Sequence, residues 1–255
     1  NYDDIYSYAE SAHFPVLVRP SYVLGGRAMQ IVYSKEQLVD YVFRSAEATN
    51  DHPILIDQFI ENAFEFDVDA LSDGENVFIA GIMQHIEEAG VHSGDSSCVI
   101  PPYEMSDSVK KDIEDITTKL ALELNVIGLI NLQFAVKDQK VYVLEVNPRS
   151  SRTVPFVSKY SNIPLASIAA QISVGKKIQD FNLEKNNFEH IAVKKAVLPF
   201  KKFKDEKVFL GPEMKSTGEV MGIDSNTGKA FLKAMRSDGY SCLLYTSPSP
   251  RDATL

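Results

Sequence analysis

The sequence is short of cysteine, of basic residues and of long apolar runs. It has 2 cysteines among 255 residues, Cys98 and Cys242, which lack the short spacing of a zinc or redox motif. Neither a disulfide framework nor a zinc site is therefore expected, and a reducing, cytoplasmic location is the default. No apolar stretch approaches the about 20 residues that a membrane helix needs, so no membrane partner is expected. The residues after Asn1 also lack the basic and apolar regions of a signal peptide.

Acidic residues outnumber basic ones by 35 to 26, which gives a formal net charge of −9. Proteins that bind nucleic acid normally show the opposite balance, so nucleic acid is not an expected partner. An acidic chain can still bind a phosphate-bearing ligand, but only at a local site that supplies its own donors. The hydrophobic content of 44% is that of a globular protein with a sizeable core.

The two ends of the chain differ from its middle. The first residue is not Met, and residues 242–255 change abruptly to a composition rich in Ser, Pro and Thr without periodicity. We expect residues 242–255 to be a non-native tail outside the fold, and the chain to be a fragment of a longer protein.

Between the ends, short β-rich runs outnumber helical ones. Residues 15–19 and 29–33 predict two strands that form a hairpin through a loop containing Gly25 and Gly26. Helices are predicted at 35–48, at 107–124, where the helical periodicity is strongest, and at 165–174. Further strands are predicted at 53–60, 65–71, 77–85, 130–136, 141–146 and 192–198. Hairpins dominate, so the predicted class is α+β with a largely antiparallel sheet and flanking helices.

The strongest candidate site lies on the hairpin formed by residues 130–146. Side chains alternate along a strand, so Asn131 and Gln133 are expected on the face opposite to the apolar residues 130, 132, 134 and 136. On the return strand, one face is expected to carry Val141, Val143, Glu145 and Asn147. An odd-length turn would place Gln133 opposite Glu145.

Oxygen atoms of Gln133, Glu145 and Asn147 would then converge as hard ligands. Such a set suits Mg²⁺, which completes its shell with water and substrate phosphate oxygens. Directly after them, Arg149 and Arg152 supply two cations for phosphate groups. The alternative is that all five are ordinary solvated residues on an exposed sheet face. Their grouping on consecutive strands and one loop favours the metal and phosphate site.

A second candidate combines Arg19 with the loop Gly25-Gly26-Arg27. Glycines let backbone N–H groups approach phosphates closely, although a lone Gly-Gly is more often only a turn. The spacing of a P-loop is missing, which excludes a P-loop NTPase.

The third candidate is the polar loop Gly90–Ser96, whose two glycines would let its backbone approach a ligand. His85 and His92 lack metal spacing and are each expected to be structural. Lys194 and Lys195, which are adjacent to each other in the sequence, are expected to be solvated.

Three strings resemble the large chain of carbamoyl phosphate synthetase: Arg19–Ala28, His85–Ser96 and Glu145–Lys159. More narrowly, they are similar to the C-terminal ATP-grasp half of that family, which phosphorylates carbamate. The resemblance covers residues 1–240 and implies an ATP-grasp domain at 1–175. It further implies the end of this region with a connection at 176–222, and the truncated start of an allosteric domain at 223–241.

The resemblance also assigns roles to residues. Arg149 and Arg152 would steady the transferring phosphoryl group and carbamate, while Mg²⁺ or Mn²⁺ would be bound by Gln133, Glu145 and Asn147. ATP would be bound by Arg19, Gln58, Ile60, Glu65, Gly90, Val91, His92, Ser93, Gln133 and Glu145. His85 and Glu87 resemble part of the family's K⁺ site.

The implied activity is the phosphorylation of carbamate by ATP, within a synthesis of carbamoyl phosphate from bicarbonate and ammonia or glutamine. The implied partners are an N-terminal synthetase half and a glutaminase subunit or domain that supplies ammonia. Two alternatives stay open. One is another ATP-grasp ligase, such as a biotin-dependent carboxylase component, and the other is a nucleotide-binding fragment without turnover.

Overall fold

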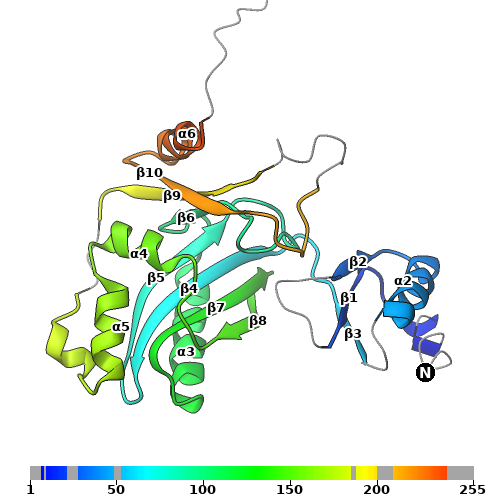
Figure 1. Ribbon diagram of the computed structural model, residues 1–255, viewed down its shortest axis with the longest axis horizontal. Coiled ribbons are helices and arrows are strands. Elements are labelled where there is room, and N and C mark those ends of the chain that lie inside the picture. Colours follow the sequence, from blue (N-terminus) through cyan, green and yellow to red (C-terminus); the bar gives the residue numbers. More distant parts are fainter. Residues whose placement is uncertain are drawn as a thin grey trace, which may run out of the picture.

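The computed structural model describes residues 7–8, 10–21, 28–48, 53–184, 188–199 and 209–239 (Figure 1). The glycine loop at 25–27 and the tail at 242–255, both singled out above, lie outside these described residues. The described strands form a three-stranded sheet of order β2-β1-β3 and a seven-stranded sheet of order β10-β9-β6-β5-β4-β7-β8. The predicted α+β class with a largely antiparallel sheet is confirmed.

The smaller sheet comes from the N-terminal part of the chain. Its central strand β1 (Val16–Pro20) pairs antiparallel with β2 (Gln30–Val32) and with β3 (Ile54–Gln58). The pairing of β1 with β2 confirms the predicted hairpin. Helix α2 (Lys35–Ala48) packs on the strands, and Figure 1 shows this unit to one side of the larger sheet. Its core is made by Val16, Val18, Val32, Leu38, Tyr41 and Val42.

The larger sheet is antiparallel throughout. Its strands are β4 (Phe64–Asp73), β5 (Val77–His85), β6 (Cys98–Ile100), β7 (Ile127–Lys137), β8 (Lys140–Asn147), β9 (Ile191–Val197) and β10 (Gly218–Asp224). The helices around it are α3 (Asp107–Glu123), α4 (Val154–Ser161), α5 (Leu165–Ser173), the 3-10 turn η1 (Ile178–Phe181) and α6 (Thr227–Ser237).

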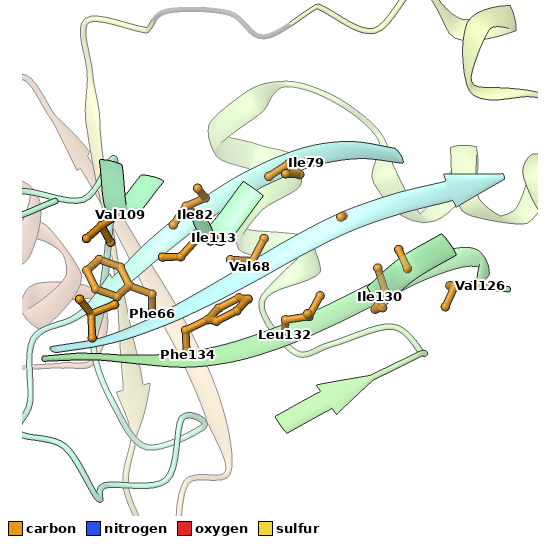
Figure 2. Packing of buried hydrophobic residues seen from close by; sticks show 13 residues of the cluster. Phe66, Val68, Ile79, Ile82, Val109, Ile113, Val126, Ile130, Leu132 and Phe134 are labelled. Atoms are coloured by element: carbon orange, nitrogen blue, oxygen red, sulfur yellow. The ribbon is translucent and has the colours of Figure 1, made fainter. Parts of the chain in front are cut away.

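One face of the larger sheet is apolar (Figure 2), and residues of α3 pack against it. Alternation along β4 and β7 turns Phe66, Val68, Leu132 and Phe134 to this face, as predicted. Each fully buried side chain of this size contributes roughly 1.5–3 kcal/mol to stability. Packing of α3 therefore holds the strands in place from one side. The other face of the sheet is free to carry other side chains.

The opposite face is divided between an apolar and a polar part. Leu71, Met83 and Leu129 pack beneath α4 and α5, whereas the rest of this face carries polar side chains of β4, β5, β7 and β8. The candidate site lies on this polar part. Within the described ranges, every helix is too short or too polar to cross a lipid bilayer.

Candidate functional site

Polar side chains on the larger sheet lie in rows that run across neighbouring strands. Two adjacent rows, each on β8, β7 and β4 in that order, are Glu145, Gln133 and Asp67, and Asn147, Asn131 and Asp69. Cross-strand neighbours on one face have Cβ atoms about 4.5–5.5 Å apart. Strand pairing alone therefore brings these six side chains together.

The pairing of Gln133 with Glu145 is confirmed, but it arises differently from the predicted route. The turn is two residues long, and Asp138 and Gln139 both have positive φ, 50° and 64°, which is typical of a type I′ hairpin. A bulge then leaves Leu144 without a partner, because the register shifts between Gln133 and the next residue. The predicted odd-length turn was therefore wrong.

The same bulge corrects the predicted face of the return strand. Val141 and Val146 both pack against the α3 core, although an uninterrupted alternation would place them on opposite faces. A bulge adds one residue and turns the side chains that follow it over. The prediction that one face carries Val141, Val143, Glu145 and Asn147 was therefore wrong. Only the last two of these residues face the polar side.

The three predicted metal ligands hold their polar atoms close together. Asn147 Nδ2 donates to Glu145 Oε1, and Gln133 Nε2 donates to Ser93 Oγ at 2.8 Å. The second bond commits the Gln133 nitrogen and leaves its amide oxygen for a cation, beside the exposed Glu145 carboxylate. Two such hard oxygens fit Mg²⁺. The Asn147 oxygen accepts from Arg149 Nη2 at 3.1 Å, so it would join them only after that amide turns.

The two predicted phosphate-binding arginines follow in the loop after β8. Arg149 is exposed and donates to Asn147, so it lies directly beside a predicted metal ligand. Arg152 reaches in another direction and donates from Nη1 to Ser216 Oγ at 3.3 Å. Guanidinium groups provide fixed arrays of donors that match phosphate oxygens.

The loop between β5 and β6 is tied to this polar face. The Gly90 N–H donates to Glu65 Oε1 at 2.9 Å, and the Ser93 hydroxyl accepts from Gln133. The Ser93 carbonyl accepts from Lys194 Nζ at 3.1 Å. The structure thus brings the predicted nucleotide loop to the predicted metal ligands.

Gly90 marks the place where this loop meets the smaller sheet. It has a φ of 97°, and a Cβ there would lie 3.0 Å from both Ile31 and Phe59. Both the backbone angle and the space therefore favour glycine.

The other residues predicted to bind ATP belong to the smaller sheet or follow it. Arg19 Nε lies 3.1 Å from Asp57 Oδ2, in a half-exposed ion pair. Gln58 ends β3, and Ile60 lies two residues later. Among the described residues, no hydrogen bond or ion pair joins Arg19, Gln58 or Ile60 to the polar face.

His92 is fixed inside its loop, and Val91 lies half-buried before it. His92 Nδ1 accepts from the Gly94 N–H at 3.0 Å, and the His92 N–H donates to the Gly211 carbonyl at 2.7 Å. Burial lowers the pKa of His92, which favours a neutral ring. These contacts agree with a structural role.

A segment that the sequence did not connect with the site packs over this loop. The buried Asp95 carboxylate accepts from the backbone N–H groups of Lys215 and Ser216, each at 2.8 Å. The Ser216 hydroxyl donates to the Gly94 carbonyl at 2.9 Å and also accepts from Arg152. The segment before β10 is therefore attached to the loop and to Arg152 of the candidate site.

The sequence also gave no indication of a buried charged cluster next to the loop. His85 lies between two acids, with Nε2 3.0 Å from Asp67 Oδ2 and Nδ1 3.2 Å from Glu65 Oε2. Burial disfavours the charged ring, but Cys98, Asp67 and Glu65 outweigh it and raise the pKa of His85. Lys194 is 1% exposed, so its predicted solvation was wrong. Burial opposes its charge too, yet Cys98 and Asp67 raise the pKa of Lys194.

The proposed K⁺ residues have different partners. His85 belongs to the buried cluster, whereas Glu87 Oε2 accepts from the Ser97 N–H. The K⁺ site stays a prediction. A shallow hollow between α3 and the Asp138–Gln139 turn contains none of the site residues described above.

Comparison with known sequences gives the same family as the motifs. Residues 1–181 match the model described as "Carbamoyl-phosphate synthase L chain, ATP binding domain". The carbamoyl phosphate synthase large chain of Archaeoglobus fulgidus is 60% identical over 232 residues, which are 91% of this chain and 22% of that protein. That of Methanosphaerula palustris is 57% identical over 226 residues, or 89% of this chain and 21% of the relative. The chain thus spans about a fifth of the length of these curated relatives.

Solved structures resemble the fold at low sequence identity. The biotin carboxylase domain of Hydrogenobacter thermophilus 2-oxoglutarate carboxylase, in complex with MgADP, ADP and bicarbonate, has a TM-score of 0.65 at 18% identity, over 79% of this chain and 46% of that one. The biotin carboxylase of Campylobacter jejuni, in a βγ-ATP complex, has a TM-score of 0.62 at 17% identity, over 81% and 46%. The likeness confirms the predicted ATP-grasp fold. Because the family model covers most of the chain, the chain belongs to the family of the carbamoyl-phosphate synthase large chain, through its ATP-binding domain.

Proposed function

We propose that this chain phosphorylates carbamate with ATP, as part of carbamoyl phosphate synthesis. The observation that carries the proposal is the pairing of Gln133 with Glu145 across the β7–β8 hairpin. It sets the Gln133 amide oxygen beside the exposed Glu145 carboxylate. Arg149 and Arg152 lie in the loop that follows β8. The family assignment favours carbamate, rather than the substrate of a different ATP-grasp ligase, as the group that is phosphorylated.

The metal would be Mg²⁺, or Mn²⁺ with the same oxygen ligands. Glu145 and the Gln133 oxygen would hold it. The Asn147 oxygen would be the third protein ligand, once its hydrogen bond from Arg149 is broken. Water and phosphate oxygens of ATP would supply the remaining ligands. The metal would neutralise charge on the β- and γ-phosphates.

ATP would lie between the two sheets, along the loop Gly90–Ser93. Arg19, Gln58 and Ile60 would approach it from the smaller sheet. Glu65 Oε1 already accepts from the Gly90 N–H, so its main contribution would be to hold this loop in place.

Phosphoryl transfer requires in-line positioning and neutralisation of the charge on the γ-phosphate. A carbamate oxygen would attack the γ-phosphorus while the bond to the β-phosphate oxygen breaks, which gives carbamoyl phosphate and ADP. Carbamate is already an anion, so no general base is needed. Arg149 and Arg152 would balance the charge of the transferring group and of carbamate.

The wider setting follows from the family. In the whole protein, an N-terminal synthetase half would make the carbamate, and a glutaminase subunit or domain would supply ammonia. The proposed domain limits are 1–175, 176–222 and 223–241, with 242–255 outside the fold. K⁺ near His85 and Glu87 and a cytoplasmic location complete the proposal.

The test is ATP formation from MgADP and carbamoyl phosphate. Glu145→Ala should reduce the rate by more than about 100-fold, because the metal loses its carboxylate. Glu123→Ala removes an exposed carboxylate at the end of α3 and should leave the rate unchanged. A rate that survives Glu145→Ala would disprove the metal site.

Two further assays separate the alternatives. Bicarbonate- and biotin-dependent ATP hydrolysis, without use of carbamoyl phosphate, would identify a carboxylase-type ligase. Protection by MgATP against proteolysis without any transfer would identify a nucleotide-binding fragment.

A further inference from the structure

Asp69 lies in the middle of β4 and is completely buried, yet it is surrounded by hydrogen-bond donors. Asn131 Nδ2 donates to its carboxylate at 3.0 Å, Ser151 Oγ at 2.7 Å and Thr153 Oγ1 at 2.6 Å. The two hydroxyl groups are also 2.8 Å apart. One carboxylate thus gathers donors from β7 and from the loop after β8.

Both hydroxyl groups belong to the loop that carries the arginines. Ser151 and Thr153 are the two neighbours of Arg152, and Arg149 lies two residues earlier. Anchoring these hydroxyl groups to a central strand restrains the backbone on both sides of Arg152. Asp69 itself has no hydrogen bond to either arginine among the described contacts.

Thr153 shows that this anchor replaces a common local interaction. It occupies the N-cap position of α4, but its side chain makes no capping hydrogen bond to the helix. An N-cap threonine ordinarily stabilises a helix through that bond. Here the Thr153 hydroxyl donates to Asp69 instead, and this hydrogen bond attaches the loop to β4.

The three donors around Asp69 stabilise its ionised form, which can accept a hydrogen bond from each of them. Burial raises the pKa of Asp69 to about 6, while Thr153, Ser151 and Asn131 oppose the increase and Asp67 adds to it. The three donors favour the ionised form near neutral pH. A carboxylate is acceptor-only when ionised, which suits three N–H or O–H partners.

Asp73 on the same strand provides a contrast. It is also buried and bonded, but it accepts from the backbone N–H groups of Glu75, Asn76 and Ile178, far along β4 from the arginine loop. Asp69 and Asp73 are therefore both buried, hydrogen-bonded carboxylates on one strand, and they differ in which segments they attach.

We propose that Asp69 is a positioning residue for phosphoryl transfer, which anchors Ser151 and Thr153 and thereby fixes where Arg149 and Arg152 meet the transferring phosphate. The inference rests on the proposed function. Misplacing a catalytic group by about 1 Å can cost about 100-fold in rate. Loss of the anchor should thus act on the rate constant and much less on nucleotide affinity.

The first measurement is hydrogen exchange of the backbone at 147–153, followed by mass spectrometry. Asp69→Asn keeps the volume but turns an N–H₂ group toward a donor, so exchange in this segment should become at least about tenfold faster. Asp73→Asn is the matched control and should leave this segment unchanged, whatever it does to stability.

The second measurement is ATP formation from MgADP and carbamoyl phosphate, at a temperature where each variant is folded. Asp69→Asn should lower kcat by about 100-fold while KM for MgADP changes by less than about threefold. Asp73→Asn should have neither effect.

Thr153 gives a second pair that does not depend on the folding of an Asp69 variant. Thr153→Val removes the hydroxyl at nearly constant volume and should reproduce both effects in weaker form. Thr153→Ser keeps the hydroxyl and should restore slow exchange and a rate within about threefold of the parent.

Several results would overturn the proposal. Unchanged exchange at 147–153 in both Asp69→Asn and Thr153→Val would disprove the anchor. Faster exchange with an unchanged kcat would disprove its role in positioning. If the parent chain forms no ATP, the proposed function fails for this chain, and hydrogen exchange alone then decides whether Asp69 anchors the arginine loop.

Discussion

Replacing Lys194 by Met should destabilise this protein far more than the same change at its neighbour Lys195. Lys194 is 1% exposed, and its ammonium group donates to the Ser93 carbonyl at 3.1 Å. Met fills a similar volume, so the change removes a charge and a hydrogen bond with little loss of packing. The Asp67 carboxylate is also buried, and its charge helps to raise the pKa of Lys194. Without Lys194, its one ion-pair partner among the described residues is His85.

The magnitude follows from burial. Lys194 makes no described ion pair with Asp67, but the two buried charges influence each other. Removing one of two opposite buried charges typically costs about 3–5 kcal/mol, because the other is left uncompensated. Asp67 Oδ1 already lacks a hydrogen-bond partner among the described contacts, so nothing nearby compensates for the loss. The Lys195 side chain is 21% exposed and lies 2.5 Å from Asp238 Oδ2, which is 24% exposed. Pairs close to solvent are worth about 0–1 kcal/mol.

Urea unfolding at pH 7 measures both changes directly. We expect a loss of about 3–5 kcal/mol for Lys194→Met and of about 1 kcal/mol or less for Lys195→Met, with unchanged m values. Equal losses for the two variants would refute the charge-balance argument. The double variant Asp67→Asn/Lys194→Met should regain part of the stability, because the unbalanced acid is gone. A double variant no more stable than Lys194→Met would assign the loss to the hydrogen bond with Ser93.

Two further predictions concern pH and packing. The pKa of His85 is raised, so its charged form stabilises the folded state. This stabilisation is complete below pH of about 6.5, the pKa of an unfolded histidine, and is lost as pH rises through the folded pKa. Urea unfolding from pH 6.5 to 9 should show this decrease in the free energy of unfolding of the parent and a smaller decrease in His85→Gln. A Cβ at Gly222 would lie 2.0 Å from the Ala230 carbonyl and 2.5 Å from the Ala234 nitrogen, whereas one at Gly218 on the same strand meets nothing within 4 Å. Gly222→Ala should therefore lower thermal stability by at least about 1–3 kcal/mol and Gly218→Ala should not, and equal thermal midpoints would contradict the close packing of α6 on β10.

The local parts of the fold could be predicted from the sequence because they depend on near neighbours. Alternation identified the core face of β4 and β7, and the short polar turn identified the hairpin that carries Gln133 and Glu145. Asn147 and Arg149 lie within four positions of Glu145 and Arg152 lies seven positions after it, so one hairpin and one loop contain most of the predicted chemistry.

The rest depends on pairings between distant segments. Lys194 and Lys195 are the same residue type at adjacent positions, so the sequence does not distinguish them. The pairing of β9 with β6 places Lys194 opposite Cys98, where its side chain is buried. The bulge at Leu144 has no Gly or Pro to mark it. Asp95 could be recognised as important only once the segment at 215–216, 120 residues later, is placed over it.

The distribution of charge across the larger sheet favours the β8 edge for the proposed divalent cation. Asp67 has buried positive neighbours in His85 and Lys194, and Asp69 has three hydrogen-bond donors. A metal at either acid would have to displace those partners in a region closed to water. Glu145 is exposed, and its one described hydrogen bond comes from a neutral amide. Of the three acids in these rows, Glu145 therefore offers a carboxylate at the lowest cost of rearrangement, and it does so where phosphate groups of a nucleotide can enter from solvent.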